Sequence, residues 1–171
     1  MLLVCFTVIE LTAQESYPTP PDGQNRLFYL QRTGNTNTIV YDANVSGAGA
    51  FKPSDPVNIY WLRYAEGGGA QGLSYVQRTF AYGVKCQKVT GANEFDFHLV
   101  CYSKKKLRLA FDSHGKPYAT VEVNGRKMKL DRIFVKIDKG TIFTLAPKVE
   151  YVEFWGKDHG TGAAVYEKFI P

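Results

Sequence analysis

The sequence predicts a mainly β fold: an antiparallel curled sheet or barrel-like fold of about nine or ten strands with one short helix. From residue 26 onward, apolar runs rich in β-branched and aromatic residues alternate with clusters of Gly, Asn and Asp, which is typical of strands joined by short turns. The 171 residues, 44% of them hydrophobic and 14% aromatic, suffice for one domain with its own core. We predict a single β-rich domain over residues 26–171, and favour a barrel over two packed sheets because closure removes exposed edges.

The first 14 residues, MLLVCFTVIELTAQ, resemble the apolar part of a secretory signal, with small residues near Thr12 and Ala13 as a cleavage point. Glu10 interrupts the apolar run and no basic residue precedes it, so a buried N-terminal strand is the alternative. The stretch is too short to span a bilayer as a helix. Residues 15–25 contain three prolines and are predicted to form an extended linker. We expect an exported protein, periplasmic or associated with the cell envelope, without a transmembrane span.

Three strands are predicted in the N-terminal part of the domain. Residues 27–31 and 38–43 form a hairpin across residues 33–37, whose Gly and Asn residues tolerate left-handed backbone angles. The third strand, residues 57–64, alternates an apolar set that includes Trp61 with a second set of side chains.

Residues 72–83 are ambiguous between helix and strand. Leu73, Val76 and Phe80 fall at the i, i+3 and i+7 positions of one helical face, whereas strand alternation over the same positions is poor. We therefore favour a short helix. Gly83 is predicted to be its C-terminal cap, where glycine adopts left-handed backbone angles at little cost.

The next two strands, residues 84–89 and 94–103, carry Cys86 and Cys101 on their apolar faces. A turn centred just before Glu94 would place the two cysteines opposite each other. A disulfide between Cys86 and Cys101, which an oxidising compartment permits, and a pair of packed core thiols are the two alternatives, because disulfides between adjacent strands need particular geometry.

The C-terminal half is predicted to contain further strands at residues 105–111, 118–123, 126–138, 141–145, 149–155 and 163–169. Asn124-Gly125 is the strongest short hairpin signal in the chain. The apolar alternation changes parity between Leu130 and Ile133, so the strand must absorb one extra residue around residues 131–132. We predict a β-bulge there.

Lys and Arg exceed Asp and Glu by five, 21 against 16, and the basic residues concentrate in consecutive strands of the C-terminal half. This excess favours acidic ligands but lacks the clustering and motifs of nucleic-acid-binding proteins. An ordinary solvated sheet face is the alternative. We predict no nucleic-acid partner.

No histidine or cysteine stands in a metal-ligand or catalytic spacing. Asp96 and His98 share a strand face, which permits a contact between them, but the sequence places no nucleophile beside them. We therefore predict no cofactor, no metal site and no catalytic residue, and favour a non-enzymatic role.

Planar amides and guanidinium groups occur beside aromatic rings in the N-terminal half of the domain. Such a surface can stack on a sugar or hold a carboxylate through paired hydrogen bonds. The predicted ligand-binding residues are Arg32, Asn35, Asn37, Tyr60, Arg63, Gln77, Arg78 and Tyr82. The alternative is structural, because Arg and Gln at the rim of a sheet commonly satisfy backbone carbonyls.

These residues lie in three sequence segments, NRLFYLQRTGNTNTIVYDAN, DPVNIYWLRYAEGG and LSYVQRTFAYGVK. The segments resemble those of an uncharacterised family of small exported bacterial proteins. The family is known only as a domain of unknown function. The likeness covers residues 26–169. It implies export and a single domain, and it supplies no activity, cofactor or catalytic residue.

Three functional hypotheses follow. The first is a binding module of the cell envelope that holds a small amphipathic or sugar-like ligand, including an envelope glycan, in the mouth of the barrel; it requires a sizeable cavity. The second is a hydrolase acting on envelope glycans or peptides, which requires carboxylates at working distance in a cleft. The third is an interaction or scaffold subunit, which requires a large exposed apolar patch. The oligomeric state stays open.

Overall fold

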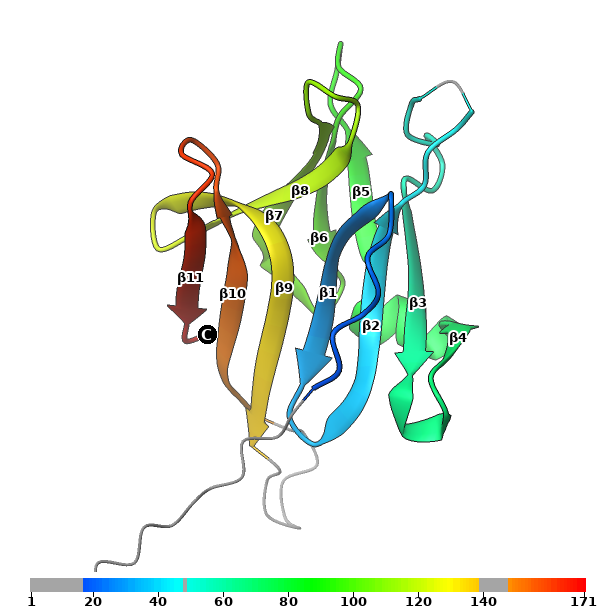
Figure 1. The fold of residues 1–171 in the computed structure, drawn as a ribbon, viewed down its shortest axis with the longest axis vertical. Coiled ribbons are helices and arrows are strands. Elements are labelled where there is room, and N and C mark those ends of the chain that lie inside the picture. Colours follow the sequence, from blue (N-terminus) through cyan, green and yellow to red (C-terminus); the bar gives the residue numbers. More distant parts are fainter. Residues whose placement is uncertain (1–16, 48, 139–147) are drawn as a thin grey trace, which may run out of the picture.

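The computed structural model describes residues 17–47, 49–138 and 148–171. Their strands form one curled sheet that wraps into a half-barrel (Figure 1). The mainly β class and the curled sheet with one short helix are confirmed. The strands are β1 (Arg26–Arg32), β2 (Asn35–Ala43), β3 (Val57–Arg63), β4 (Gly69–Gly72), β5 (Val84–Lys88), β6 (Phe95–Leu99), β7 (Tyr102–Phe111), β8 (Pro117–Val123), β9 (Arg126–Asp138), β10 (Lys148–Asp158) and β11 (Ala164–Phe169).

The sheet runs in the order β4-β3-β2-β1-β9-β8-β7-β6-β5. β9 pairs with β8 along its first half and with β1 along its second half, while β10 and then β11 extend the sheet from its other edge. Among the described strands, every pairing is antiparallel except that of β1 with β9, which is parallel. The sequence did not predict this parallel pair, because it joins segments that lie far apart in the chain and leaves no local signal.

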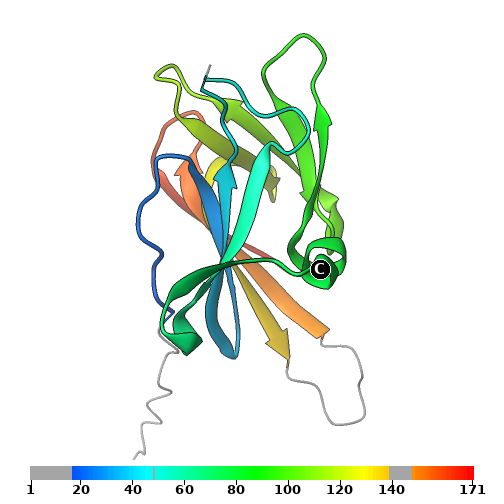
Figure 2. The same ribbon diagram turned by 90° about the vertical axis from the view of Figure 1, so that its right-hand side faces the viewer.

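The sheet stays open where a closed barrel was favoured. β4 and β5 are the two ends of the strand order, and no ladder joins them in the part of the chain that the structure describes. Instead, residues 73–83 carry the chain from one of these edges to the other as a short helical segment (Figure 2). This segment therefore lies at the gap of the half-barrel, where a pairing strand would otherwise be needed.

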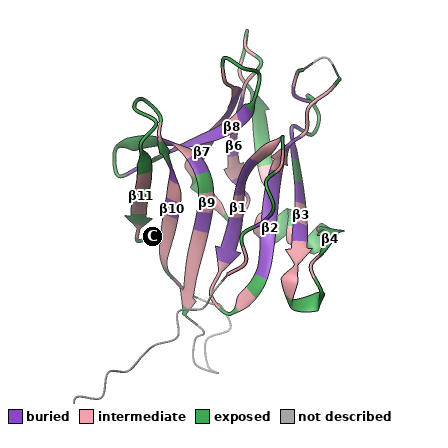
Figure 3. Cartoon of the chain, viewed as in Figure 1, coloured by how far each residue is buried: buried purple, intermediate pink, exposed green. Residues whose placement is uncertain are grey.

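The hydrophobic core fills the inside of the curl. Phe28 of β1, Tyr41 of β2 and Phe97 of β6 are fully buried and meet across it, although β6 is not a neighbour of β1 or β2 in the sheet. The rings of Phe28 and Tyr41 are stacked with centroids 4.4 Å apart, and those of Phe28 and Phe97 lie 6.4 Å apart. Burial is deepest in the central strands and falls off at β4 and β11 (Figure 3).

The predicted β-bulge in β9 is confirmed. Trp155 of β10 pairs with Arg132, but the next residue, Gly156, pairs with Leu130, so Asp131 is left between the two pairs. The ladder is tight at this point, because a Cβ on Gly156 would lie 1.9 Å from the carbonyl oxygen of Lys129. Glycine is therefore required opposite the bulge for steric reasons.

The Asn124-Gly125 hairpin is also confirmed. Asn124 has a φ of 52° and Gly125 a φ of 78°. Two successive positive φ angles are the requirement of the type I′ turn that joins twisted strands in a two-residue hairpin.

The single strand predicted over residues 94–103 is wrong. β6 ends at Leu99 and β7 begins at Tyr102, so Cys101 lies in the turn between them. The run carries no Gly or Pro to signal the break. The hairpin register also differs from the expected one, because Cys86 pairs with Phe97 and not with Cys101. Both cysteines are free and exposed, so the structure contains neither the Cys86–Cys101 disulfide nor the pair of packed core thiols.

We expect both thiols to react slowly with alkylating reagents at neutral pH. Desolvation by surrounding protein atoms raises the pKa of Cys86 to about 11, although the residue as a whole is exposed, and desolvation also raises the pKa of Cys101. Only about one Cys86 thiol in a thousand is then a thiolate at pH 8, and the thiolate is the reactive form. Iodoacetamide labelling without reductant, followed by mass spectrometry of the peptides, should label both residues, and the labelling of Cys86 should accelerate about tenfold per pH unit up to pH 10. Labelling that requires prior reduction would contradict the free-thiol state.

The predicted helix is present, and part of its apolar face is exposed. Ser74 begins it with a capping box, since Gln77 N donates to Ser74 Oγ over 3.3 Å and Ser74 N donates to Gln77 Oε1 over 2.9 Å. One helical turn, α1 (Tyr75–Gln77), continues as a π-helical turn, η2 (Arg78–Tyr82). Val76 and Phe80, which the periodicity placed on one face with Leu73, are 63% and 71% exposed. The helical periodicity correctly groups these residues on one face of the helix. It does not predict whether that face packs against the sheet or faces solvent.

Gly83 follows this helix in an extended conformation, with φ −65° and ψ 170°, so the predicted left-handed cap is wrong. A different constraint selects glycine. A Cβ here would lie 1.9 Å from the carbonyl oxygen of Arg78. The carbonyl of Gly83 also accepts a hydrogen bond from Val100 N over 2.9 Å, which holds the helix end against β6.

The described part of the predicted linker, residues 17–25, lies against the outer face of the sheet. Gln31 Nε2 donates to the carbonyl oxygen of Pro18 over 2.8 Å, and the rings of Tyr17 and Phe134 meet edge to face at 5.1 Å. The expected signal at residues 1–14, with Cys5, and the expected strand at residues 141–145 lie outside the described residues. Within the described ranges, no helix has the length and apolar content needed to cross a membrane.

Candidate functional site

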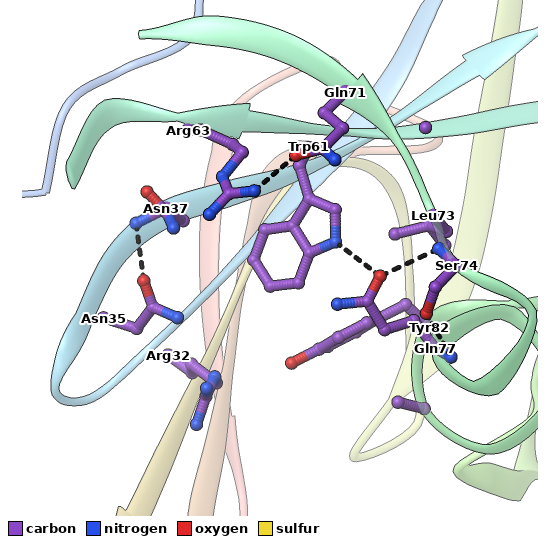
Figure 4. A pocket seen from close by; sticks show the side chains of 12 residues that line it. Arg32, Asn35, Asn37, Trp61, Arg63, Gln71, Leu73, Ser74, Gln77 and Tyr82 are labelled. Atoms are coloured by element: carbon purple, nitrogen blue, oxygen red, sulfur yellow. Dashed lines mark hydrogen bonds between the residues drawn. The ribbon is translucent and has the colours of Figure 1, made fainter. Parts of the chain in front are cut away.

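A pocket of about 640 Å³ opens where the β1–β2 hairpin, the ends of β3 and β4, and the helical segment meet (Figure 4). Six of the eight predicted ligand-binding residues line it, namely Arg32, Asn35, Asn37, Arg63, Gln77 and Tyr82. The β1–β2 turn brings the first three together, and the capping box at Ser74 sets the position of Gln77. The pocket therefore unites residues from four strands and the helical segment at the gap of the half-barrel.

The other two predicted residues do not line the pocket. Tyr60 lies on the opposite face of β3, where its hydroxyl donates to Asp42 Oδ2 over 2.9 Å and accepts from Arg26 Nη2 over 3.4 Å. Arg26 Nε also donates to Asp42 Oδ1 over 2.6 Å. Arg78 is an exposed residue at the C-terminal end of α1. Both have places outside the pocket that the residue type alone did not reveal.

Trp61 is a pocket residue that the sequence analysis missed. Its parity with the other apolar residues of β3 suggested a core side chain, and it is indeed only 8% exposed. Near the open end of the half-barrel, however, the inner face of β3 becomes the wall of the pocket. Gln71 was missed for another reason, since the short strand β4 that carries it has no apolar alternation.

Trp61 and Tyr82 form an aromatic wall with ring centroids 5.1 Å apart and planes at 80°. Hydrogen bonds hold the Trp61 ring and the backbone of Tyr82. Trp61 Nε1 donates to Gln77 Oε1 over 3.3 Å, and the hydroxyl of Tyr41 donates to the carbonyl oxygen of Tyr82 over 2.9 Å. Full burial raises the pKa of Tyr41 well above its ordinary value, so this donor stays protonated. The wall is therefore preorganised by contacts from behind it.

A second network fixes the side of the pocket near β3. Arg63 Nη2 pairs with Glu66 Oε1 over 2.9 Å, and Arg63 Nη1 donates to Gln71 Oε1. Both polar atoms of the Asn37 side chain bind the turn after β3. Nδ2 donates to Glu66 Oε2 over 3.0 Å, and Oδ1 accepts from Ala65 N over 2.9 Å. The hydrogen bond from Arg63 holds the pKa of Glu66 below its ordinary value. Arg63 is thus neutralised by its own carboxylate partner, and Asn37 is structural.

Arg32 is different, because it has no partner among the described residues. Its Nε is buried without a hydrogen bond, and no described carboxylate pairs with its guanidinium. Two nearby polar groups are also unused in the described structure: the Nδ2 of Asn35, whose Oδ1 accepts from Asn37 N over 2.9 Å, and the hydroxyl of Tyr82. Figure 4 shows the Tyr82 hydroxyl and the Asn35 amide directed to the side of the pocket where Arg32 lies, below the Trp61 ring.

The pocket offers little for acid–base or nucleophilic chemistry. None of the described residues that line it is an Asp, Glu, His or Cys. The pair considered from the sequence lies elsewhere, on β6, and Asp96 there is engaged by Arg108 Nε over 2.6 Å and Lys106 Nζ over 3.7 Å. No group of three His, Cys, Asp or Glu residues that could hold a metal ion occurs in the described ranges.

The inside of the curl provides a smaller, apolar pocket. Phe95, Phe97, Leu107 and Leu109 are buried, and the space left between the β9–β11 and β6–β7 ends measures about 190 Å³. The barrel mouth considered from the sequence is therefore largely filled, and the roomier polar pocket lies beside the helical segment instead.

The predicted basic face is largely committed to local contacts. Arg108 pairs with Glu94 over 2.8 Å, and Arg126 pairs with Glu167 over 3.3 Å. Arg132 lies 4.5 Å from the centroid of the Trp155 ring, at cation–π distance. These contacts match the interpretation of an ordinary sheet face more closely than a site for acidic ligands.

Comparison with known proteins places the chain in a family without giving it an activity. No curated protein and no solved structure shows significant similarity to it. The family model described as "Domain of unknown function (DUF4833)" matches residues 28–168, which is most of the chain and includes every pocket residue discussed above. The chain belongs to this family of domains of unknown function.

Proposed function

We propose that this protein is a binding module that holds a small sugar-like ligand in the pocket beside the helical segment. The observation that carries the proposal is the convergence of unpartnered polar groups, on Arg32, Asn35 and Tyr82, below a fixed aromatic wall. A volume of about 640 Å³ is within the range of small-molecule sites. Aromatic rings with amide and guanidinium groups around them are suited to the apolar faces and hydroxyl edges of a sugar ring.

Binding is favoured over hydrolysis by the composition of the pocket. A glycosidase of the common type needs two carboxyl groups flanking the bond to be cleaved. The described lining residues supply none, while they supply donors in excess. The preorganised wall, with Trp61 and Tyr82 fixed by Gln77 and Tyr41, reduces the entropy that a ligand would lose on binding.

Export to the cell envelope is part of the proposal and rests on the signal-like residues 1–14. We expect the protein recovered from the envelope of its own cells to begin between residues 13 and 15. N-terminal sequencing checks this expectation, and recovery of the uncleaved chain from the cytosol would contradict it.

Ligand binding can be measured through Trp61. The chain has two tryptophans, Trp61 and Trp155, so the Trp155→Phe variant leaves fluorescence from the pocket. Titration with a panel of neutral, N-acetylated and acidic monosaccharides should produce a saturable change with at least one of them. In the same background, Tyr82→Phe should weaken binding roughly threefold to tenfold, the effect of one neutral hydrogen bond.

Tyr60→Phe is the matched control, since it also removes one tyrosine hydroxyl but from the face of β3 outside the pocket. Its affinity should equal that of the parent. A panel without any saturable response, or an equal loss in Tyr60→Phe and Tyr82→Phe, would refute the proposed site.

A further inference from the structure

We propose that the ligand of this pocket is an acidic sugar and that Arg32 receives its carboxylate. This inference rests on the proposed function and deepens it. The first step is the charge of the pocket: two arginines line it and no described lining residue is acidic. Glu66, just outside, is paired with Arg63 over 2.9 Å and therefore cancels that charge. The uncompensated charge is that of Arg32.

The second step is the unpaired Nε of Arg32, a residue that is half-buried. Its Nε is buried with no hydrogen-bond partner in the part of the chain that the structure describes. A buried donor without a partner is costly to the folded state, and an unpaired charged donor more so. An anion paired with the guanidinium would offset part of this cost, so the free protein gains from binding one.

The third step is the rigidity of the base from which Arg32 extends. β1 ends at Arg32, which pairs with Asn35 of β2 on one edge and with Val135 of β9 on the other. The backbone is therefore fixed on both sides. A guanidinium offers parallel N–H groups that match the two oxygens of a carboxylate, whereas a lysine would present a point charge without this geometry.

The fourth step is the nature of the neighbouring groups. Asn35 accepts from Asn37 N with its Oδ1, which leaves its NH₂ group as a donor facing the pocket, and the Tyr82 hydroxyl is available beside it. Donors flanking an arginine suit an anion with further hydroxyl oxygens. The adjacent Trp61 ring suits the C–H face of a sugar. Together these groups indicate a carboxylate attached to a sugar ring, as in a uronic acid or a muramic acid derivative.

The test compares matched neutral and acidic sugars by isothermal titration calorimetry on the full chain. The pairs are glucose with glucuronate, galactose with galacturonate, and N-acetylglucosamine with N-acetylmuramate. We expect the acidic member of at least one pair to bind roughly 10- to 100-fold more tightly than its neutral partner, the effect of a charge-assisted hydrogen-bonded pair. Arg32→Gln should abolish that difference.

Arg78→Gln is the matched control, because it removes the same charge from an exposed residue that does not line the pocket. It should change the affinity for the acidic sugar less than twofold. Arg32→Lys keeps the charge but not the paired geometry and should give an intermediate affinity. Because Arg32 is unpaired in the free protein, Arg32→Gln should leave the thermal midpoint of the ligand-free protein unchanged or raised, which excludes misfolding as the cause of lost binding.

The outcomes separate this inference from the proposed function. If neutral and acidic sugars bind equally well and Arg32→Gln leaves both affinities unchanged, the carboxylate assignment is wrong while the sugar pocket stands. If Arg78→Gln weakens binding as much as Arg32→Gln, the effect is one of net charge and the assignment is again wrong. If no sugar of the panel binds, both proposals fail.

Discussion

Replacing Gly83 with alanine should lower the free energy of unfolding by about 3 kcal/mol, at the upper end of what overpacking usually costs. The backbone of Gly83 has φ −65° and ψ 170°, angles that alanine adopts freely, so strain in the backbone is not the reason. The reason is contact, since the new Cβ would lie 1.9 Å from the carbonyl oxygen and 2.9 Å from the carbonyl carbon of Arg78.

The Gly83 side of this contact cannot move without losing a hydrogen bond. The carbonyl of Gly83 accepts from Val100 N over 2.9 Å, and the carbonyl of the preceding residue, Tyr82, accepts from the Tyr41 hydroxyl over 2.9 Å. The clash must therefore displace the helical segment. Because this segment carries Gln77 and Tyr82 into the pocket, the variant should also lose ligand affinity.

Urea-induced unfolding measures the first effect and fluorescence titration the second. Gly69→Ala is the control, because no heavy atom lies within 4 Å of its added Cβ, and its stability should stay within about 0.5 kcal/mol of the parent. An unchanged unfolding midpoint for Gly83→Ala would show that the helix end is not packed as described.

Local sequence patterns were enough to predict most of the strands. Alternation and the Asn124-Gly125 turn gave β8 and β9 almost to the residue, and the parity change near Asp131 gave the bulge. These features are set by side chains a few positions apart, which the sequence displays directly. The break at Val100 was missed because its residues favour a strand as much as those around it.

Features that depend on distant contacts could not be predicted in the same way. The parallel pairing of Tyr29 with Arg132 joins two strands whose own patterns say nothing of a partner. For the same reason the sequence could not decide between a closed barrel and an open half-barrel. The gap between β4 and β5 is the feature that creates the pocket.

The sequence predicted only some of the residues that line the pocket. Residue chemistry selected Arg32 and Tyr82, but it selected Tyr60 over its neighbour Trp61. Adjacent strand residues point to opposite faces, and the inner face was assigned to the core. That assignment holds along most of β3 and fails at its end, where Trp61 borders open space. Arg32 is unpaired because no described carboxylate lies close enough to it in the folded structure. Local sequence patterns do not predict which carboxylates lie near a given arginine.

Phe28→Ala should have the largest effect on stability of any substitution considered. Phe28 is fully buried, stacks on Tyr41 with centroids 4.4 Å apart and faces Phe97 across the curl. Loss of a buried phenylalanine costs about 3–5 kcal/mol through lost burial and the cavity left behind, a large share of the roughly 5–15 kcal/mol of a typical domain.

Phe80→Ala removes the same side chain from the helical segment, where it is 71% exposed. Its cost should be within about 0.5 kcal/mol, as for other exposed positions. Urea unfolding of both variants, at several protein concentrations, measures the contrast. A cost for Phe80→Ala near that of Phe28→Ala would contradict the exposed position of Phe80. A cost that grows with protein concentration would instead mean that a second copy covers this face, since association stabilises the folded state by mass action.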